Sequence, residues 1–248
     1  MSVTAIIPAR FGSTRFPGKP LAAETGKHLI QHVCERVAEA RSVQRCVVAT
    51  DDERIRAAVA SFGGEAVMTA ADHQSGTDRI AEVVRRLGDS AGEIILNVQG
   101  DEPEIEPAHL DRLVERLERE GDCEMATLAT PFPAEADAAS PDRVKVVCDA
   151  RGRALYFSRA LVPYARDEAL GAAARLLHVG VYAYRRGFLL EFSGWGPGKL
   201  EQVEKLEQLR ALEHGAAIAV EVVGRAAAGV DTPADYAAFV ARWRQGRR

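Results

Sequence analysis

The first twenty residues place the tightest constraint on what this chain can fold into. The apolar run Val3 to Ile7 predicts a buried strand, and a turn-rich loop follows it. The loop contains two glycines, two small hydroxyl residues and three cations, which are Arg10, Arg15 and Lys19. At the C-terminal edge of a parallel sheet, such a loop receives polyphosphate, because glycines let backbone N–H groups approach the anion. The cations would neutralise charge that otherwise repels an anionic nucleophile.

This loop matches neither of two common phosphate-binding patterns. A P-loop has four residues between its first glycine and a Gly-Lys pair that is followed by Ser or Thr. Here five residues separate Gly12 from Gly18, and Pro20 follows Lys19. The loop also lacks the Gly-x-Gly-x-x-Gly of dinucleotide-binding folds. The alternative is a solvated basic loop, but Pro17 and Pro20 stiffen the segment, which a simple connection does not require.

Apolar strands alternate with amphipathic helices along the chain. The expected strands are 3–7, 45–50, 94–98, 125–130, 144–148, 178–184 and 217–223. Apolar side chains at helical spacing predict helices over 30–37, 55–62, 80–87, 110–117 and 236–243. Strand–helix–strand order in the first half implies right-handed crossovers, and therefore an α/β fold with a mostly parallel sheet flanked by helices.

The pattern changes after about residue 120. Strands become longer and alternate in polarity, helices become scarce, and irregular stretches are expected at 131–142 and 164–177. We interpret the whole chain, 1–248, as one domain with an antiparallel excursion at about 125–200. This excursion would act as a lid or a second lobe.

Composition excludes several classes of protein. Of the 248 residues 47% are hydrophobic, which is ordinary for a globular chain, and the formal net charge is −4. Without a long basic run, nucleic acid is not expected as a partner. No apolar stretch approaches the roughly 20 residues that span a bilayer, so no membrane association is expected.

The cysteines and the N-terminus predict a cytoplasmic protein. The N-terminus lacks a signal-peptide pattern. The four cysteines form no C-x-x-C pair and are predicted to be free thiols, with Cys46 and Cys148 buried in strands.

Asp101 follows the apolar strand at 94–98. An acid at the carboxyl end of a parallel strand lies beside the binding crevice, where it could ligate Mg²⁺, a hard ion that prefers oxygen. The alternative is a β-turn built from Gly100, Asp101 and Pro103.

Other acids and histidines have structural interpretations. The stretch Asp51-Asp52-Glu53 opens a helix, where acids favour the dipole. Thr232 is an expected N-cap, with Pro233 at the first helical position and Asp235 completing a capping box. His28 and His32 lack a third metal ligand and are predicted to be surface histidines.

Seven motifs in order carry a resemblance that covers Val3 to about Phe239. They are Ala9-Arg-x-Gly-Ser-Thr-Arg-x-Pro-Gly-Lys-Pro20, Ala71-Asp-His-Gln-Ser-Gly-Thr-Asp-Arg79, Asn97-Val-Gln-Gly-Asp-Glu-Pro103, Ala154-Leu-Tyr-Phe-Ser-Arg159, His178-Val-Gly-Val-Tyr182, Leu206-Glu-Gln-Leu-Arg210 and Gly229-Val-Asp-Thr-Pro233. Together they resemble the cytidylyltransferases that activate acidic sugars, and in particular the 3-deoxy-manno-octulosonate (Kdo) cytidylyltransferases. The resemblance implies a Rossmann-like nucleotidyltransferase sheet with an antiparallel excursion that serves as lid or dimerisation surface.

The resemblance also implies roles for individual residues. Asp101 and Asp231 would hold Mg²⁺, and Arg10, Arg15 and Lys19 would be catalytic. The expected nucleotide contacts are Ala9, Arg10, Ser13, Lys19, Ser75, Gly76 and Gln99. The expected sugar contacts are Gln99, Arg159, His178, Tyr182, Glu207 and Gln208, with Arg159 on the carboxylate.

The implied reaction transfers CMP from CTP to Kdo, giving CMP-Kdo and pyrophosphate for bacterial lipopolysaccharide biosynthesis. The sequence identifies no general base, and a metal-bound hydroxyl could lose its proton to solvent. The resemblance suggests a homodimer.

Two alternatives stay open at this point. Another acidic-sugar cytidylyltransferase would act on a sialic-type acid or an 8-amino analogue of Kdo. A regulatory nucleotide-binding protein would bind without turnover, although binding alone would not require a second carboxylate.

Overall fold

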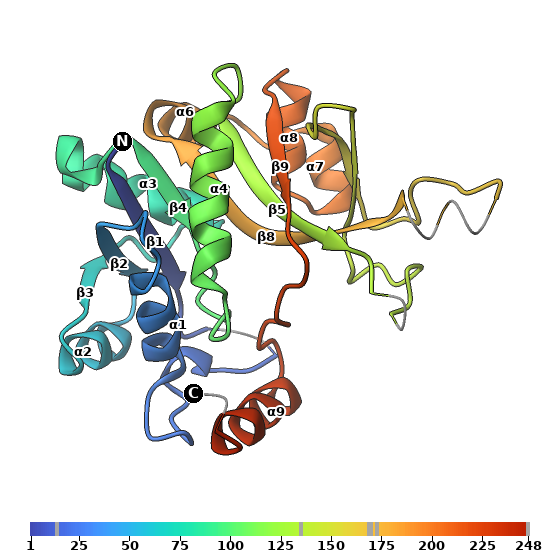
Figure 1. Ribbon diagram of the computed structural model, residues 1–248. Helices are drawn as coiled ribbons and strands as arrows, with labels where there is room; N and C mark the ends of the chain where they lie inside the picture. The colour runs from blue at the N-terminus through green and yellow to red at the C-terminus, as the bar shows by residue number, and fades with distance from the viewer. Residues whose placement is uncertain (13–14, 134–135, 168–170, 172–173, 247–248) are drawn as a thin grey trace. The chain divides into compact units, whose positions relative to one another are not determined.

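A computed structural model describes residues 1–12, 15–133, 136–167, 171 and 174–246 of the chain. The chain divides into two compact units: residues 1–111 with 227–248, and residues 112–226. The helix α4 (Pro107–Arg119) contains the point of division. Figure 1 shows the elements in chain order by colour.

The first unit contains a four-stranded parallel sheet in the order β3-β2-β1-β4. Its strands are β1 (Val3–Ala9), β2 (Arg45–Thr50), β3 (Glu65–Met68) and β4 (Ile94–Asn97). All of β4 and nearly all of β1 are buried, as the unbroken apolar runs predict for parallel strands. The chain runs outward from β1 to β3 and then crosses to β4 on the other side of β1. A binding crevice is expected beside the carboxyl ends of the two strands at this reversal.

Helices connect the strands of this unit. They are η1 (Lys19–Leu21), α1 (Leu29–Ala38), α2 (Glu53–Ser61), α3 (Gly76–Leu87), η2 (Gly88–Ala91) and α9 (Pro233–Arg244). The helices predicted from apolar spacing are therefore confirmed, as is the parallel sheet. The short strand β3 was missed, because four half-exposed residues give no clear period.

A hydrophobic cluster packs α9 against α1 and the loop after β1. Leu29 of α1 packs with Val230 and with Tyr236, Phe239 and Val240, and Phe16 of the loop after β1 packs against the cluster. Phe16 thereby anchors that loop through its side chain, with its ring centroid 5.7 Å from that of Tyr236.

The prediction that His32 lies on the surface is wrong. His32 is 3% exposed, and its ring packs edge-on against Phe239 and Trp243. Its Nε2 lies 2.7 Å from Thr25 Oγ1, so the polar edge of the ring is bonded. Burial lowers the pKa of His32. The i, i+4 spacing of His28 and His32 gave no indication that α9, about 200 residues later, covers this face of α1.

The second unit is mainly antiparallel. Its strand β8 (Leu176–Arg185) pairs antiparallel with β5 (Met125–Pro131) and β6 (Lys145–Cys148), and β6 pairs antiparallel with β7 (Ala154–Ser158). On its other side, β5 pairs parallel with β9 (Ile218–Val222). The antiparallel excursion is confirmed, whereas β7 was not foreseen.

The expected scarcity of helices after residue 120 is wrong. Three short helices follow β8, namely α6 (Arg186–Phe192), α7 (Lys199–Glu204) and α8 (Gln208–Glu213). Each spans at most two turns, which is too short for a clear apolar period.

The four cysteines are free, as predicted. The expected burial of Cys46 and Cys148 is wrong, because both are only partly buried and Cys123 alone is fully buried. None of the helices in the described part of the chain is long and apolar enough to span a membrane.

Candidate active site

Lys19 forms hydrogen bonds with an acid and a backbone carbonyl at the carboxyl edge of the parallel sheet, beside β1 and β4. Its Nζ donates to Asp101 Oδ2 at 2.7 Å and to the carbonyl oxygen of Val230 at 2.8 Å. The Asp231 carboxylate is 3.7 Å from the same nitrogen. The Lys19 side chain is 11% exposed, so this ammonium group is held in a largely desolvated place among acids.

A backbone hydrogen bond brings the two distant acids to one place. Val230 N donates to the carbonyl oxygen of Asp101 at 2.8 Å, so the segment before α9 runs alongside the loop after β4. Arg15 also bonds to Asp231, at 3.1 Å, in a more exposed pair. The structure thus gathers Arg15, Lys19, Asp101 and Asp231, which the sequence predicted as a set. The side chain of Arg10 is exposed and has no ion-pair partner among the described residues.

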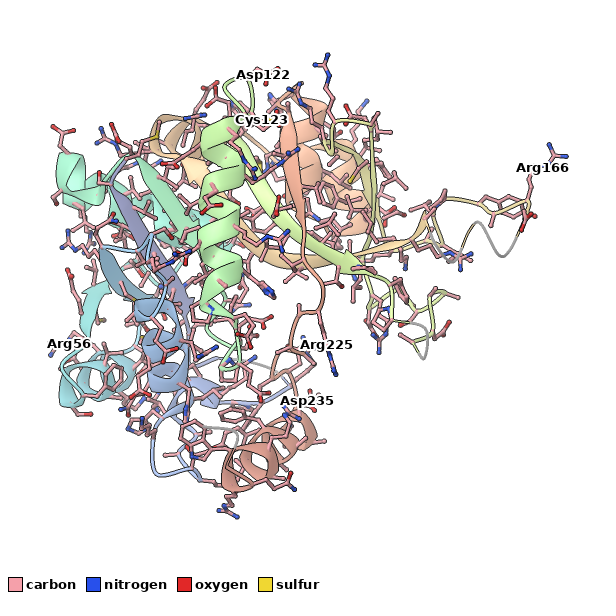
Figure 2. All side chains as sticks on the ribbon, viewed as in Figure 1. Arg56, Asp122, Cys123, Arg166, Arg225 and Asp235 are labelled. Atoms are coloured by element: carbon pink, nitrogen blue, oxygen red, sulfur yellow. The ribbon has the colours of Figure 1, made fainter. Side chains whose placement is uncertain are left out.

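Asp231 is not needed to cap α9, because Asp235 and Thr232 do this. Asp235, labelled in Figure 2, accepts from the backbone N–H groups of Asp231 and Thr232, and Thr232 caps α9. The predicted capping box is therefore confirmed. Because Asp235 performs the capping, the carboxylate of Asp231 keeps lone pairs for a ligand.

Glu102 is a third acid at this place, to which the sequence analysis assigned no role. Burial, together with the charges of Asp101 and Asp231, raises the pKa of Glu102 to about 8, against the lowering effect of Lys19. A side chain at Gly229 would stand 3.1 Å from Glu102 Oε1, so this carboxyl is closely packed. Its position directly after Asp101 was the available signal. The two carboxylates of Asp101 and Asp231 around one ammonium leave an excess of negative charge, which suits a divalent cation.

A different acidic cluster is not a comparable metal site. Glu120, Asp122 and Cys123 lie within metal-ligand reach of one another, and the last two are labelled in Figure 2. Arg153 donates to both carboxylates, at 3.0 and 2.6 Å. The acids are therefore neutralised by an arginine that the fold itself supplies.

Several of the predicted nucleotide contacts lie near the end of β1. Gly76 begins α3, and a Cβ there would lie 3.3 Å from the ring of Pro8, while a Cβ at Gly100 would lie 3.0 Å from the Pro8 carbonyl oxygen. Gly76 is thereby placed next to Pro8, the residue before Ala9. Ser75 also caps α3 through a bond from Asp78 N, so its hydroxyl has a structural use as well. Gln99 is half-buried and donates to Asn97 Oδ1, whereas Ser13 lies outside the described residues.

A buried arginine fixes the loops at this edge and was also missed. Arg79 of α3 donates to Thr69 Oγ1, to the Ala70 carbonyl and to Asp51 Oδ2. It thereby ties the loop after β3 to the loop after β2. The structural interpretation of the Asp51–Glu53 stretch is confirmed, because Asp52 also caps α2.

Apart from Gln99, the predicted sugar contacts lie in the second unit. His178 and Tyr182, both on β8, have ring centroids 5.5 Å apart. Burial lowers the pKa of His178 to about 3. Burial raises the pKa of Tyr182 well above its usual value, with Tyr184 and Glu207 adding to the rise. A neutral ring and a protonated phenol therefore stand together at neutral pH.

Two further predicted sugar contacts differ in how they are held. Gln208, at the start of α8, is 5% exposed, and its Nε2 has no hydrogen-bond partner among the described residues. An unpaired buried donor of this kind is suited to a ligand. Arg159 donates to the carbonyl oxygens of Glu204, Pro141 and Lys205. These bonds use three of its five N–H groups.

Comparison with known proteins identifies the family. The cytidylyltransferase family model matches residues 4–218. The chain belongs to the cytidylyltransferase family. This cytidylyltransferase is 53% identical over 240 residues to the 3-deoxy-manno-octulosonate cytidylyltransferase of Syntrophobacter fumaroxidans, covering 97% of this chain and 96% of that one. It is equally identical, over 244 residues, to the protein of that name from Geobacter sulfurreducens, covering 95% and 96%. The resemblance inferred from the motifs is confirmed.

Solved structures agree with the fold of this cytidylyltransferase. The structure of a CMP:2-keto-3-deoxy-manno-octonic acid synthetase complexed with CTP superposes with a TM-score of 0.93, at 44% identity over 99% of both chains. A 4-diphosphocytidyl-2C-methyl-D-erythritol synthase from Anaerococcus prevotii gives a TM-score of 0.61 at 13% identity, which shows a shared fold alone.

The loop geometry of this cytidylyltransferase yields a stability prediction. Gly18 has a φ of +70°, and a Cβ there would meet Phe11 Cε2 at 2.9 Å, whereas a Cβ at Gly12 would meet nothing within 4 Å. Gly18→Ala is expected to lower the free energy of unfolding by about 1–3 kcal/mol, because the left-handed backbone and the contact both resist a side chain. The matched control, Gly12→Ala, should change it by less than about 0.5 kcal/mol. Urea denaturation measures both, and equal losses would contradict the interpretation.

His178 yields a pH prediction. The usual pKa of histidine, 6.5, falls to about 3 for His178 in the folded protein. Between these values the unfolded chain binds a proton that the folded chain does not, so stability falls as the pH is lowered. Denaturation curves should show wild type losing up to about 1.4 kcal/mol more per pH unit than His178→Gln. Exposed His214 supplies the control, His214→Gln, which should keep the wild-type slope; a wild-type slope in His178→Gln would contradict the prediction.

Proposed function

We propose that this protein transfers CMP from CTP to Kdo, releasing pyrophosphate, as a step in bacterial lipopolysaccharide biosynthesis. One observation carries the proposal: Lys19, Asp101 and Asp231 converge at the switch point of the sheet, in a chain 53% identical to Kdo cytidylyltransferases. In the reaction, the anomeric hydroxyl of Kdo attacks the α-phosphorus of CTP. A new P–O bond forms, the bond from the α-phosphorus to pyrophosphate breaks, and the hydroxyl proton passes to solvent.

The cations of the loop after β1 would offset the repulsion between the two negatively charged substrates. A sugar carboxylate must approach a triphosphate, and two like charges about 4 Å apart repel by about 4 kcal/mol at an effective dielectric of 20. Arg10, Arg15 and Lys19 would offset this repulsion and stabilise the charge that develops on the phosphates. Arg10 is exposed, and Arg15 and Lys19 are held by the acids until the nucleotide binds.

The acids fit a magnesium ion. Mg²⁺ takes one or two carboxylates together with substrate phosphates, and Asp101 and Asp231 present oxygens to a common point that Lys19 reaches. When bound there, the ion would neutralise phosphate charge and align the attacking and leaving oxygens. Asp101 and Asp231 would hold the ion, and the raised pKa of Glu102 keeps that neighbouring carboxyl largely protonated near neutral pH.

The remaining predicted residues would recognise the base, ribose and sugar. Ala9, Ser75 and Gly76 lie around the end of β1, a suitable place for a base edge, and Gln99 is close to Asp101 in sequence. Ser13 is proposed as a nucleotide contact on the motif alone. Arg159 would bind the sugar carboxylate through its remaining N–H groups, with His178, Tyr182, Glu207 and Gln208 on the hydroxyls.

We further propose a cytoplasmic homodimer. The second unit exposes several large apolar side chains, among them Leu155, Tyr164 and Val203 at 62, 87 and 81%. A second copy of the chain that covers such side chains would remove them from water. No nucleic-acid or membrane partner is proposed, in keeping with the net charge of −4.

The first experiment measures pyrophosphate release from CTP and Mg²⁺ with three acids in parallel: Kdo, its 8-amino analogue and N-acetylneuraminate. Release is expected with Kdo and only when Mg²⁺ is present. Release with another acid alone would retain the cytidylyltransferase chemistry and overturn the substrate. CTP binding with no release from any acid would instead favour a regulatory nucleotide-binding protein.

A second prediction concerns Lys19. Lys19→Ala is expected to lower kcat by about 10²–10³, because a preorganised donor to the phosphates is lost. Lys27→Ala is the matched control, since Lys27 is paired with Glu35 and is assigned no role in the reaction. Steady-state kinetics with CTP and Kdo measures both. A loss below tenfold in Lys19→Ala would remove Lys19 from the catalytic residues.

A further inference from the structure

A buried threonine in the second unit determines how His178 can be used. Thr127 of β5 is completely buried, and its Oγ1 lies near three polar atoms. These are His178 Nε2 at 3.0 Å, the Val179 carbonyl oxygen at 3.2 Å and the Val181 carbonyl oxygen at 2.8 Å. None of the roles proposed above involves Thr127.

Counting protons assigns the direction of these bonds. A threonine hydroxyl has one proton to donate and two lone pairs to accept with, whereas a carbonyl oxygen can only accept. If the hydroxyl donated to His178, the oxygen of Thr127 would face the Val181 carbonyl oxygen at 2.8 Å without a proton between them. The hydroxyl therefore donates its one proton on the side of the carbonyl oxygens, chiefly to Val181 at 2.8 Å, and accepts from His178. His178 must then have its proton on Nε2, which leaves the lone pair on Nδ1.

The bulge in β8 makes this arrangement possible. Thr127 is paired with Tyr182, but the next residue, Leu128, is paired with Val179, so the register shifts by two residues of β8 at this point. The Thr127 hydroxyl lies against the carbonyl oxygens of Val179 and Val181, which are both at this bulge. Thr127 thus holds the bulge and the imidazole at the same time.

The other contacts of His178 fix the plane of its ring. Its backbone N–H donates to the Val144 carbonyl oxygen at 2.9 Å. The ring stands edge-on to Phe157, with centroids 4.9 Å apart, and against Tyr182. Nδ1 has no hydrogen-bond partner among the residues that the structure describes. Burial keeps the ring neutral.

We propose that Thr127 is a positioning residue for substrate recognition: by fixing the Nε2–H tautomer of His178, it presents Nδ1 as an acceptor for a sugar hydroxyl. The inference rests on the proposed function, which places His178 in the pocket for the sugar acid. An acceptor of fixed direction selects a hydroxyl donor at one position of the substrate. It disfavours an analogue with no donor there, because an acceptor covered by the bound sugar would be left unpaired.

Two variants separate the hydroxyl from the shape of the side chain. Thr127→Val keeps the shape and removes the hydroxyl, and Thr127→Ser keeps the hydroxyl. Long-range ¹⁵N–¹H spectra of histidine-labelled protein report the tautomer directly. We expect the Nε2–H form of His178 in wild type and in Thr127→Ser, and a mixture of tautomers in Thr127→Val.

Kinetics provides the second measurement. Thr127→Val is expected to raise the KM for Kdo about tenfold to hundredfold, with the KM for CTP within twofold of wild type. Thr127→Ser should restore most of the affinity for Kdo. A parallel rise in both KM values would indicate general damage to the fold and overturn the proposal. An unchanged KM for Kdo in Thr127→Val would also overturn it.

The spectra keep this inference distinct from the proposed function. They need no turnover, so a protein inactive with every sugar acid would refute the proposed function while the tautomer is still measured. A wild-type His178 with its proton on Nδ1 overturns the role of Thr127 whatever the activity. If circular dichroism shows that Thr127→Val does not fold, the tautomer of His178 in the wild-type protein still tests the role of Thr127.

Discussion

The ammonium group of Lys19 is the interaction on which the candidate site depends. It joins segments separated by 82 and 211 positions in the chain, through the Asp101 carboxylate and the Val230 carbonyl. With Lys19 11% and Asp101 29% exposed, the pair interacts more strongly than it would in water, and removal of one partner would leave a charge without compensation. The loop after β1, the loop after β4 and the segment before α9 therefore hold one another in place. A nucleotide that takes over Lys19 would release the acids for a cation at the same step.

The sequence predicted much of this fold because periodicity is a local property. Five amphipathic helices and the buried parallel strands follow directly from the spacing of their own residues. Elements with few residues or half-exposed faces, such as β3 and α7, carry no such signal. The burial of His32 could not be predicted either, since the residues that cover it lie on α9. The motifs predicted the acids and cations as a set, but the bond from Val230 to Asp101 is a long-range contact that no spacing contains.

Helix capping shows how the fold keeps polar groups available for ligands. At α9 the backbone donors are satisfied by Asp235 and Thr232, so that Asp231, one residue earlier, contributes its carboxylate to the site. At α3 the same kind of box uses Ser75 and Asp78, and here the capping hydroxyl belongs to a predicted nucleotide contact. Ser75 can still accept a further bond through its second lone pair, because a hydroxyl has two. A capping motif and a ligand-binding motif can therefore share the same residues, which is why the sequence alone left both interpretations open.

The two groups of predicted residues recognise their ligands by different physics. Around Lys19 the groups are charged, and attraction between charges tolerates small changes of distance and direction, as suits a triphosphate that must move during the reaction. Around Thr127 burial keeps His178 neutral and Tyr182 protonated, so recognition there depends on the direction of hydrogen bonds. Acidic sugars share a carboxylate and differ in the placement of their hydroxyl and amine groups. Discrimination among them must therefore come from directed donors and acceptors. The single proton of Thr127 determines whether His178 presents a donor or an acceptor to the sugar.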